Sequence, residues 1–428
     1  MKRVTAIVGA GAVLDFDFSF EGAVFPSCNN ITEIVKKLKV DGLDVEKSDV
    51  IEKVYNVVNN KLNDIYRKRG LKGHSYTINF EELFFALESM LPQGVEYLIP
   101  TACPPLSLIE EPISELKDYP SVEVARGLYA IIRKVTEIVD GYDKHFRQSD
   151  NNEVWFRKFW KSDEKHRWDV FTFNYDTTIE HSIIDIEDGY EQLGDDENFE
   201  SFVPKKLIKN ASKLSTVQHL HGCIYYAESA PWPRHNTHGN RDMFKYKSVH
   251  EALHFLGLQQ KAENQAREEF VNSPILIGMR KLDKMTYLPN SVYHANLINQ
   301  LQKNKGLMIV GYSFGDMYVN QLLQRRMLMH GDKHRLVIID CFPSYIDSAA
   351  AFRSHLYDHR TNLLAFLSPF INFSFDDHFR LQGIDFTSFY EPIYSEDYRC
   401  MFLICGFKKA VELHGELIQK FLDGCRIN

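Results

Sequence analysis

Short runs of apolar residues, several of them rich in β-branched side chains, most constrain what this 428-residue chain can fold into. Segments with apolar residues at spacings of three and four lie between some of these runs, which is typical of amphipathic helices. Continuous apolar strands that alternate with helices indicate a parallel sheet covered on both faces. We therefore predict an α/β fold with a doubly wound parallel sheet. The strand-like runs are residues 4–12, 168–176, 217–226, 273–278, 306–313 and 334–341.

Residues 29–160 have a different pattern, because amphipathic helical periodicity replaces the strand-like runs there. Asn79 is followed three residues later by Glu82, the spacing of a capping box, which predicts a helix over residues 79–91. We expect this block to be a large helical insertion between the first and second strands. Residues 346–428 form a mixed, aromatic-rich C-terminal region that ends in an amphipathic helical pattern.

Composition and charge favour a soluble protein that binds no nucleic acid directly. The net charge is −8, and 44% hydrophobic with 25% charged residues is an ordinary globular balance. The seven cysteines are scattered and form no CxxC pair, as expected for a reduced, cytoplasmic protein. The apolar run near the N-terminus ends in Asp15 and Asp17 without a small-residue cleavage site, so we interpret it as a strand rather than a signal peptide.

Two glycine turns follow strand-like runs and are candidate ligand sites. Gly9 and Gly11 could bring backbone N–H groups close to a pyrophosphate at a helix N-terminus. The full G-x-G-x-x-G pattern is incomplete because the sixth position is Leu14, and glycine also serves turns that bind nothing. The second turn, GYSFGD at residues 311–316, offers a hydroxyl, and its Asp316 is expected to cap the next helix.

The stretch HLHGC at residues 219–223 allows several interpretations. Strand alternation predicts that His219 and His221 lie on one face. They could be buried structural residues, a metal-binding pair acting with His235 and His238, or one of them a general base beside an accessible glycine. No carboxylate or cysteine stands at a recognisable metal-ligand spacing, so we expect no metal.

A third polar cluster, Asn174 and Asp176 around an aromatic residue, ends the strand-like run at 168–176. Asn and Asp at strand ends usually cap or turn the chain. An amide at the end of a buried strand nevertheless needs a partner. A binding role and a capping role both remain open for these residues.

Taken in chain order, the glycine turn, the Asn–x–Asp triplet, the His–Gly pair and the Gly–x–Ser turn resemble the sirtuin family. The resemblance covers about residues 4–30 and 165–345, and FTFNYDTTIE, HLHG and IVGYSFGD are its most specific stretches. It is closest to bacterial sirtuin-like NAD-hydrolysing effectors of anti-phage defence. It implies a Rossmann-like NAD-binding catalytic domain made of residues 1–28 and 161–345.

The resemblance also implies roles for single residues. In the family, the G-A-G turn binds the NAD phosphates, the Asn–x–Asp pair lines the nicotinamide-ribose pocket, and the histidine before glycine is catalytic. A polar residue at the end of the last strand would meet the adenosine ribose. The implied cofactor-binding residues are Gly9, Ala10, Gly11, Thr172, Gly311, Ser313 and Asp340, and the implied catalytic residues are Asn174, Asp176 and His221.

The chain also departs from the sirtuin deacylases. It lacks their zinc module of paired CxxC motifs, and VLDFDF replaces their Arg-containing cofactor loop. Val13 stands where the family usually has a small hydroxyl residue. Sirtuin-like NADases also lack the zinc module, and they carry a helical insertion. These differences from the deacylases therefore favour the NADase group over an acyl-lysine deacylase.

The resulting hypothesis is an NAD+ hydrolase that cleaves the nicotinamide–ribose bond, with His221 as general base. Asn174 would position water or the ribose, and Asp176 would stabilise the cationic sugar or only cap a helix. NAD depletion would then serve anti-phage defence by abortive infection. The alternatives are a sensor that binds NAD or ADP-ribose without turnover, and a deacylase or ADP-ribosyltransferase on the same scaffold.

The resemblance finally implies that the activity is regulated by assembly. Relatives form homo-oligomers and work with a separate protein such as a HerA-type hexameric ATPase, a nuclease-like protein or an Argonaute. The helical insertion and the C-terminal region at 346–428 are the expected assembly surfaces.

Overall fold

The structure is a computed structural model that describes most of the chain. The described residues are 2–40, 48–69, 76–91, 106–109, 113–116, 119, 121–161, 166–192, 199–210, 213–228, 242–254, 274–278, 285–341, 390–395 and 397–424. His235 and His238 lie outside this range, as does most of the helix expected over 251–271.

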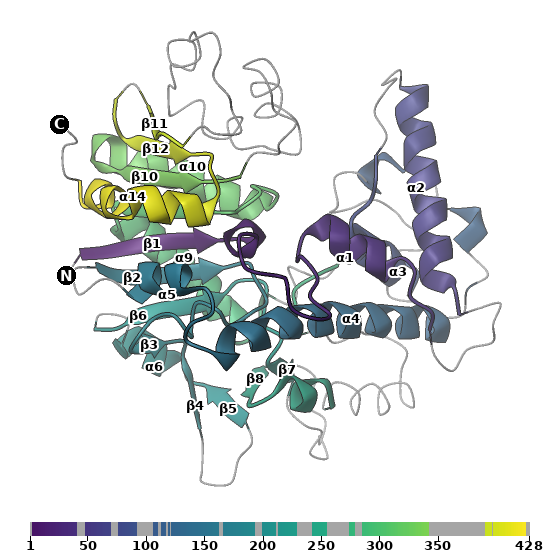
Figure 1. The fold of residues 1–428 in the computed structure, drawn as a ribbon. Coiled ribbons are helices and arrows are strands. Elements are labelled where there is room, and N and C mark those ends of the chain that lie inside the picture. The colour runs from purple at the N-terminus through teal and green to yellow at the C-terminus, as the bar shows by residue number, and fades with distance from the viewer. Residues whose placement is uncertain are drawn as a thin grey trace.

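Helices and strands alternate along the described chain (Figure 1). The strands are β1 (Lys2–Val8), β2 (His166–Thr172), β3 (Ile186–Glu187), β4 (Tyr190–Gln192), β5 (Phe199–Phe202), β6 (Ser215–His219), β7 (Tyr226–Glu228), β8 (Met243–Tyr246), β9 (Gly306–Val310), β10 (Arg335–Ile339), β11 (Ile393–Tyr394) and β12 (Cys400–Leu403). The α-helices are α1 (Cys28–Val35), α2 (Val50–Lys68), α3 (Phe80–Glu88), α4 (Ser121–Gln148), α5 (Val154–Lys161), α6 (Pro204–Asn210), α9 (Asn290–Lys303), α10 (Met317–His330) and α14 (Phe407–Leu422). Short 3₁₀ turns are η1 (Ala10–Val13), η2 (Leu106–Leu108), η3 (Ser114–Leu116) and η4 (Gly331–Lys333).

The main sheet has the order β11-β12-β10-β9-β1-β2-β6-β3, with only β11 antiparallel to its neighbour. β1 lies at its centre, and Val8 pairs with Thr172 of β2 on one side and with Val310 of β9 on the other. From β1 the chain adds β2 and β6 in one direction, then returns and adds β9, β10 and β12 in the other. The predicted doubly wound α/β fold is confirmed.

Helices cover both faces of this sheet, which explains the continuous apolar strands. In β1, Ile7 faces the core formed with α9 and α10, whereas Ala6 and Val8 face the core formed with α5 and α14. Phe407 of α14 is fully buried and contacts the rings of α5. The strands are therefore apolar at successive positions because each face is buried.

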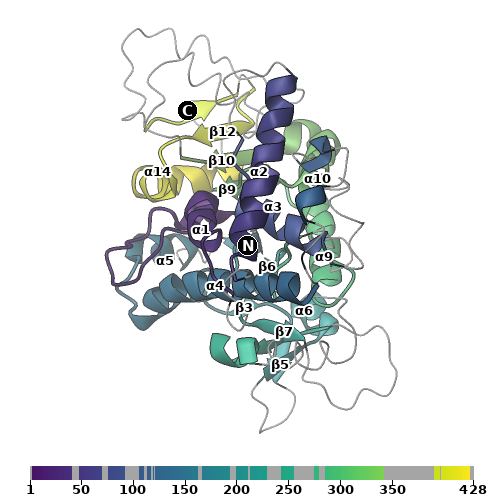
Figure 2. The same ribbon diagram turned by 90° about the vertical axis from the view of Figure 1, so that its right-hand side faces the viewer.

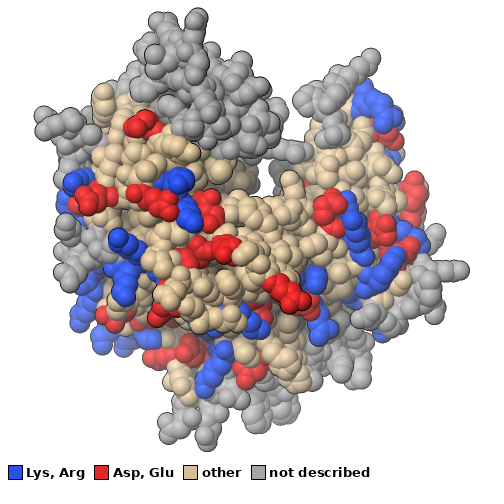
Figure 3. All heavy atoms as spheres, in the orientation of Figure 1, with Lys and Arg blue, Asp and Glu red and all other residues tan. Residues whose placement is uncertain are grey.

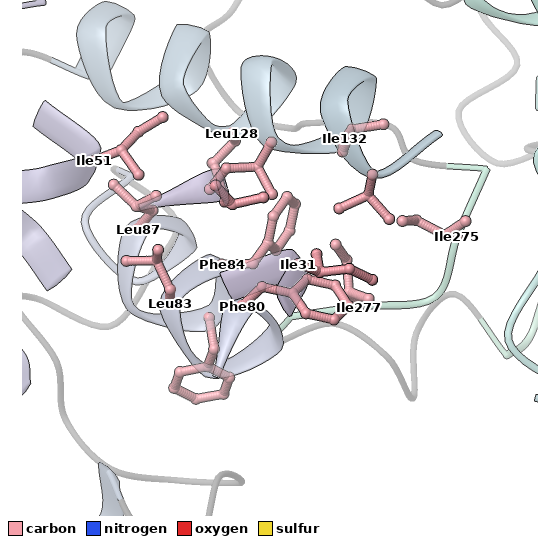
Figure 4. Packing of buried hydrophobic residues seen from close by; sticks show 14 of the residues in the cluster. Ile31, Ile51, Phe80, Leu83, Phe84, Leu87, Leu128, Ile132, Ile275 and Ile277 are labelled. Carbon is pink, nitrogen blue, oxygen red and sulfur yellow. The ribbon is translucent and has the colours of Figure 1, made fainter. Parts of the chain in front are cut away.

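Helices α1 to α4 form the expected helical block between β1 and β2, and they face the carboxyl ends of the strands (Figures 1 and 2). α3 begins at the predicted capping box, with Asn79 and Glu82 each accepting a hydrogen bond from the other's backbone N–H. The core of the block is built from α1, α2, α3 and α4 together with later residues such as Ile275 and Ile277 (Figure 4). α4 is 28 residues long and reaches from this core to the sheet, where its Phe146 joins the α5 and α14 side.

One predicted strand is wrong, and the strand β12 of the main sheet was not predicted. The described part of the apolar run at 273–278 is not a strand of the sheet, since Ile275 makes only an isolated bridge with Gly222. Ile275 and Ile277 are apolar because they pack into the core of the helical block (Figure 4). In the C-terminal region, β12 pairs in parallel with β10 and extends the main sheet, which the sequence did not indicate.

Candidate active site

Both glycine turns lie at the topological switch point of the sheet. The turn after β1 and the turn after β9 are neighbours, because these two strands pair and the winding direction reverses between them. In open α/β sheets, ligands bind at the carboxyl ends of strands at such a point. Figure 3 shows the surface hollowed between the sheet and the helical block, at the side towards which β1 points.

The two glycine turns contact each other through backbone atoms. Gly9 N–H donates to Val310 O, and Gly11 N–H donates to Gly311 O. The N···O distance is 3.0 Å in both hydrogen bonds. A Cβ on Gly9 would lie 2.4 Å from Gly311 O, so this packing alone requires glycine there. The helix expected after the first glycine turn is the short 3₁₀ helix η1, which has four residues and Gly9 at its N-cap. Ala10 is exposed, and its N–H has no acceptor in the described part of the chain. This N–H can therefore still donate a hydrogen bond to an anion.

Asn174 follows β2 at the same edge and is fixed through its backbone. Its N–H donates to Thr172 Oγ1 at a distance of 3.0 Å, and its carbonyl oxygen accepts from His219 Nδ1 at a distance of 3.1 Å. The side chain is buried, with 7% of the residue exposed, yet its Oδ1 has no hydrogen-bond partner among the described residues. A buried amide oxygen without a partner is costly unless a ligand or water supplies one.

The carboxylate of Asp176 is held within the protein. Its Oδ2 accepts a hydrogen bond from the Tyr142 hydroxyl of α4 at a distance of 2.7 Å. Its Oδ1 accepts one from the backbone N–H of Thr178, at 3.1 Å, and another from the Thr178 hydroxyl. Burial raises the pKa of Asp176, whereas these hydrogen bonds act in the opposite direction. The contacts tie the loop after β2 to α4.

The next residue of α4, Asp143, makes a second contact with this loop. Its Oδ1 accepts hydrogen bonds from Thr177 N–H, at a distance of 2.7 Å, and from the Thr177 hydroxyl, at 2.9 Å. Arg147 lies 3.0 Å from its other oxygen. Burial and the neighbouring Asp176 charge raise the pKa of Asp143 to about 6, against the effect of Arg147. Two successive residues of α4, Tyr142 and Asp143, thus bond two successive residues of the loop, Asp176 and Thr177.

His221 lies beside the second glycine turn. Its Nε2 is 3.4 Å from Asp316 Oδ2, and its ring stands edge-on to Phe173, with 4.6 Å between centroids. The residue is 8% exposed. Asp316 also caps α10 as predicted, because its Oδ1 accepts from the backbone N–H groups of Tyr318 and Val319. The sequence indicated the cap but not the contact with His221.

His219 and His221 do not share one strand face as predicted, because β6 ends at His219. His219 is fully buried and contacts Asn174 O and Glu180, whereas His221 contacts Asp316. Cys223 beside them is also fully buried, and burial raises the pKa of its thiol well above the usual value, so it is no activated nucleophile.

The other expected ligand-binding residues lie along the same edge. Thr172 ends β2 and is buried, Ser313 is exposed in the turn after β9, and Asp340 follows β10. Burial raises the pKa of Asp340 to about 6. In the part of the chain that is described, no group of three or more His, Cys, Asp or Glu could hold a metal ion, and no helix is long and apolar enough to cross a membrane.

Sequence reasoning missed Tyr142, Asp143 and Glu180, which hold the loop and the histidine. One signal was available for Asp143, since it lies four residues after Val139 on the apolar face of α4, where a charge is out of place. Glu180 gave no comparable signal.

The fold and this edge place the protein among doubly wound α/β proteins whose ligand site lies at a switch point between glycine turns. Residues 169–357 match the family model of the SIR2-like domain. The match supports a sirtuin-like family, whose members are typically NAD-dependent enzymes, and it indicates an NAD-related activity. It includes Asn174, His221 and Gly311 but begins after the first glycine turn. No curated protein sequence matches the chain.

Proposed function

We propose that this protein hydrolyses NAD+ with water to nicotinamide, ADP-ribose and a proton. The observation that carries the proposal is the buried Asn174 Oδ1, which has no partner among the described residues and lies at the sheet edge of a SIR2-like domain. This oxygen is suited to accept a hydrogen bond from a ribose hydroxyl or from the attacking water.

The order of residues along the edge suits an extended dinucleotide. Five points lie at the carboxyl ends of successive neighbouring strands, namely Asp340, the turn at Gly311, the turn at Gly9, Asn174 and His219. Together they span roughly 19 Å at about 4.8 Å per strand. The pyrophosphate would lie over the glycine turns, near Ala10 N–H. The adenosine ribose would lie towards Asp340, and the nicotinamide ribose towards Asn174.

The bond between nicotinamide and C1′ of the ribose breaks with its electron pair leaving on the pyridine nitrogen. The sugar becomes oxocarbenium-like, and a water oxygen then bonds to C1′. His221 would take a proton from that water or from a ribose hydroxyl, with Asp316 stabilising the imidazolium. Asp176 caps no helix, because only turns and bends lie between β2 and β3, but its bonds to Tyr142 and Thr178 favour a role in holding the loop over one in stabilising the sugar.

We also propose that NAD depletion serves anti-phage defence by abortive infection and that a separate partner and self-assembly control it. A HerA-type ATPase is the expected kind of partner. These proposals follow from the resemblance, and free NAD hydrolysis would otherwise be toxic to the host cell.

The test is NAD loss and nicotinamide release by the purified protein without any acyl peptide, alone and in lysate containing the products of neighbouring genes. His221→Ala and Asn174→Ala should each abolish the loss while keeping the wild-type unfolding profile. His334→Ala, which removes a buried histidine at the amino end of β10, is the matched control and should remain active. NAD binding without loss under every condition would support a sensor instead, and loss that survives His221→Ala would remove this residue as the base.

A further inference from the structure

His219 is a fully buried histidine whose two ring nitrogens both have partners. Nδ1 lies 3.1 Å from the carbonyl oxygen of Asn174, and Nε2 contacts Oε1 of Glu180. A backbone carbonyl only accepts hydrogen bonds, so Nδ1 must carry a proton. The Glu180 contact at the opposite nitrogen fixes the orientation of the ring.

Electrostatics indicate where the second proton of the pair resides. Burial alone would raise the pKa of Glu180, but the charge and hydrogen bond of His219, with Lys245 further away, outweigh it and lower that pKa. Burial alone would likewise lower the pKa of His219, but Glu180 raises it overall. The raised pKa of His219 and the lowered pKa of Glu180 favour an imidazolium paired with a carboxylate, which agrees with the two acceptors that face the ring nitrogens.

The pair determines how Asn174 is presented. Thr172 Oγ1 holds the N–H of Asn174 and His219 holds its carbonyl, so side chains fix both backbone polar groups of this residue. The neighbouring peptide groups are fixed as well, because Phe173 N–H donates to Val8 O and Leu220 N–H donates to Thr172 O, each over 2.8 Å. The carboxamide is then the part of Asn174 that is left for a ligand.

We propose that His219 is a positioning residue, whose Nδ1–H, oriented by Glu180, holds the Asn174 carbonyl and so sets the direction of the Asn174 carboxamide. This inference rests on the proposed NAD hydrolysis. It gives the two histidines of the HLHG stretch separate tasks, with His221 acting on the substrate side and His219 acting through Asn174.

Two isosteric substitutions separate the two contacts of the ring. His219→Asn places an amide N–H near the position of Nδ1, whereas His219→Gln places its amide near Nε2 and loses the contact with Asn174. We expect kcat to fall by about tenfold in His219→Asn and by about a hundredfold in His219→Gln, with KM changed by less than about threefold, as for a slightly misplaced group. Equal losses of kcat in the two variants would overturn the proposal.

Glu180→Gln provides a second test should the histidine variants fold poorly. A glutamine amide can donate to Nε2, which keeps the proton on Nδ1, so this variant should stay more active than His219→Gln. The matched control is His166→Gln, because His166 is a buried histidine whose Nε2 lies 2.6 Å from Asp423 Oδ1 at the amino end of β2. It should lower the unfolding free energy but leave kcat unchanged.

A spectroscopic measurement keeps this inference distinct from the proposed function. With histidine-selective ¹⁵N labelling, the His219 signals, assigned by their loss in His219→Gln, should show a protonated Nδ1 at neutral pH. An unprotonated Nδ1 would overturn the positioning role even if the enzyme is active. A wild-type protein that hydrolyses no NAD but shows the protonated Nδ1 would refute the proposed function while leaving the contact established.

Discussion

The backbone N–H of Gly11 donates a hydrogen bond to the carbonyl oxygen of Gly311 at a distance of 3.0 Å, so the two glycine turns of the site contact each other directly. The contact leaves no room for side chains, since a Cβ on Gly311 would lie 2.2 Å from the backbone nitrogen of Ala12. Close packing between the two turns thus requires glycine at these positions, whether or not a ligand binds there. A change at one turn must displace the other.

Gly311→Ala is therefore expected to destabilise the fold. Gly311 has a φ of +59°, which side chains rarely adopt, and the added Cβ meets backbone that cannot move aside. The loss should be at least about 2 kcal/mol of unfolding free energy, measured by urea denaturation. Gly315→Ala in the same turn is the control, because its Cβ would meet nothing closer than Ser313 Oγ at 3.5 Å. Equal stability of the two variants would contradict this account.

Tyr142→Phe should loosen the loop that carries Asp176. The substitution removes a 2.7 Å hydrogen bond to a buried carboxylate and should lower the unfolding free energy by about 1.5 to 3 kcal/mol. In a double-mutant cycle with Asp176→Asn, the combined loss should be smaller than the sum of the single losses by about 1 kcal/mol. Strict additivity would show that the hydroxyl and the carboxylate do not depend on each other.

Asp143 should give the protein a measurable dependence of stability on pH. Its pKa is about 6 in the folded protein, against an ordinary value of 3.8, because it is buried beside Asp176. The folded state binds this proton more tightly, so the associated stability is present below pH 4 and is lost as pH rises to about 6. The change amounts to about 3 kcal/mol.

The measurement compares the unfolding free energy of wild type and Asp143→Asn from pH 4 to pH 7. The difference between the two proteins should shift in favour of the variant as pH rises. Glu137→Gln, which alters an exposed carboxylate of the same helix, should follow the wild-type curve. Parallel curves for wild type and Asp143→Asn would show that Asp143 titrates normally.

Asp316 should separate helix capping from activity. Asp316→Asn keeps an oxygen for the N–H groups of Tyr318 and Val319, so stability should change by less than about 0.5 kcal/mol, whereas Asp316→Ala should lose about 1 kcal/mol. Both variants lose the carboxylate beside His221, and on the proposed mechanism both should lower kcat by about tenfold or more. Full activity in Asp316→Asn would limit Asp316 to capping.

Local patterns predicted the parts of the fold that depend on short segments. The apolar runs at 4–12, 168–176 and 306–313 contain the strands β1, β2 and β9, the Asn79 capping box begins a helix, and Asp316 caps α10. In each case a few neighbouring residues determine the conformation through burial or capping. The parallel, doubly wound sheet was predicted from continuous apolar runs that alternate with helical segments, whereas the order of its strands was not predicted.

Long-range contacts were beyond these patterns. The run containing Ile275 and Ile277 is apolar because of the helical block, which the run itself does not reveal. β12 is only four residues long, so its place in the sheet depends on β10 and not on its own sequence. The hold of α4 on the loop after β2 and the pairing of His219 with Glu180 join residues whose partners only the fold specifies.

The central place of β1 has a consequence for biosynthesis. β1 is made before its partners, which begin only at His166 and Gly306. At translation rates of about 5–20 residues per second, one edge of this apolar strand stays open for roughly tens of seconds after the strand leaves the ribosome. The helical block can begin to fold during that interval. The time needed to synthesise β9 therefore sets how long the nascent chain is exposed to aggregation.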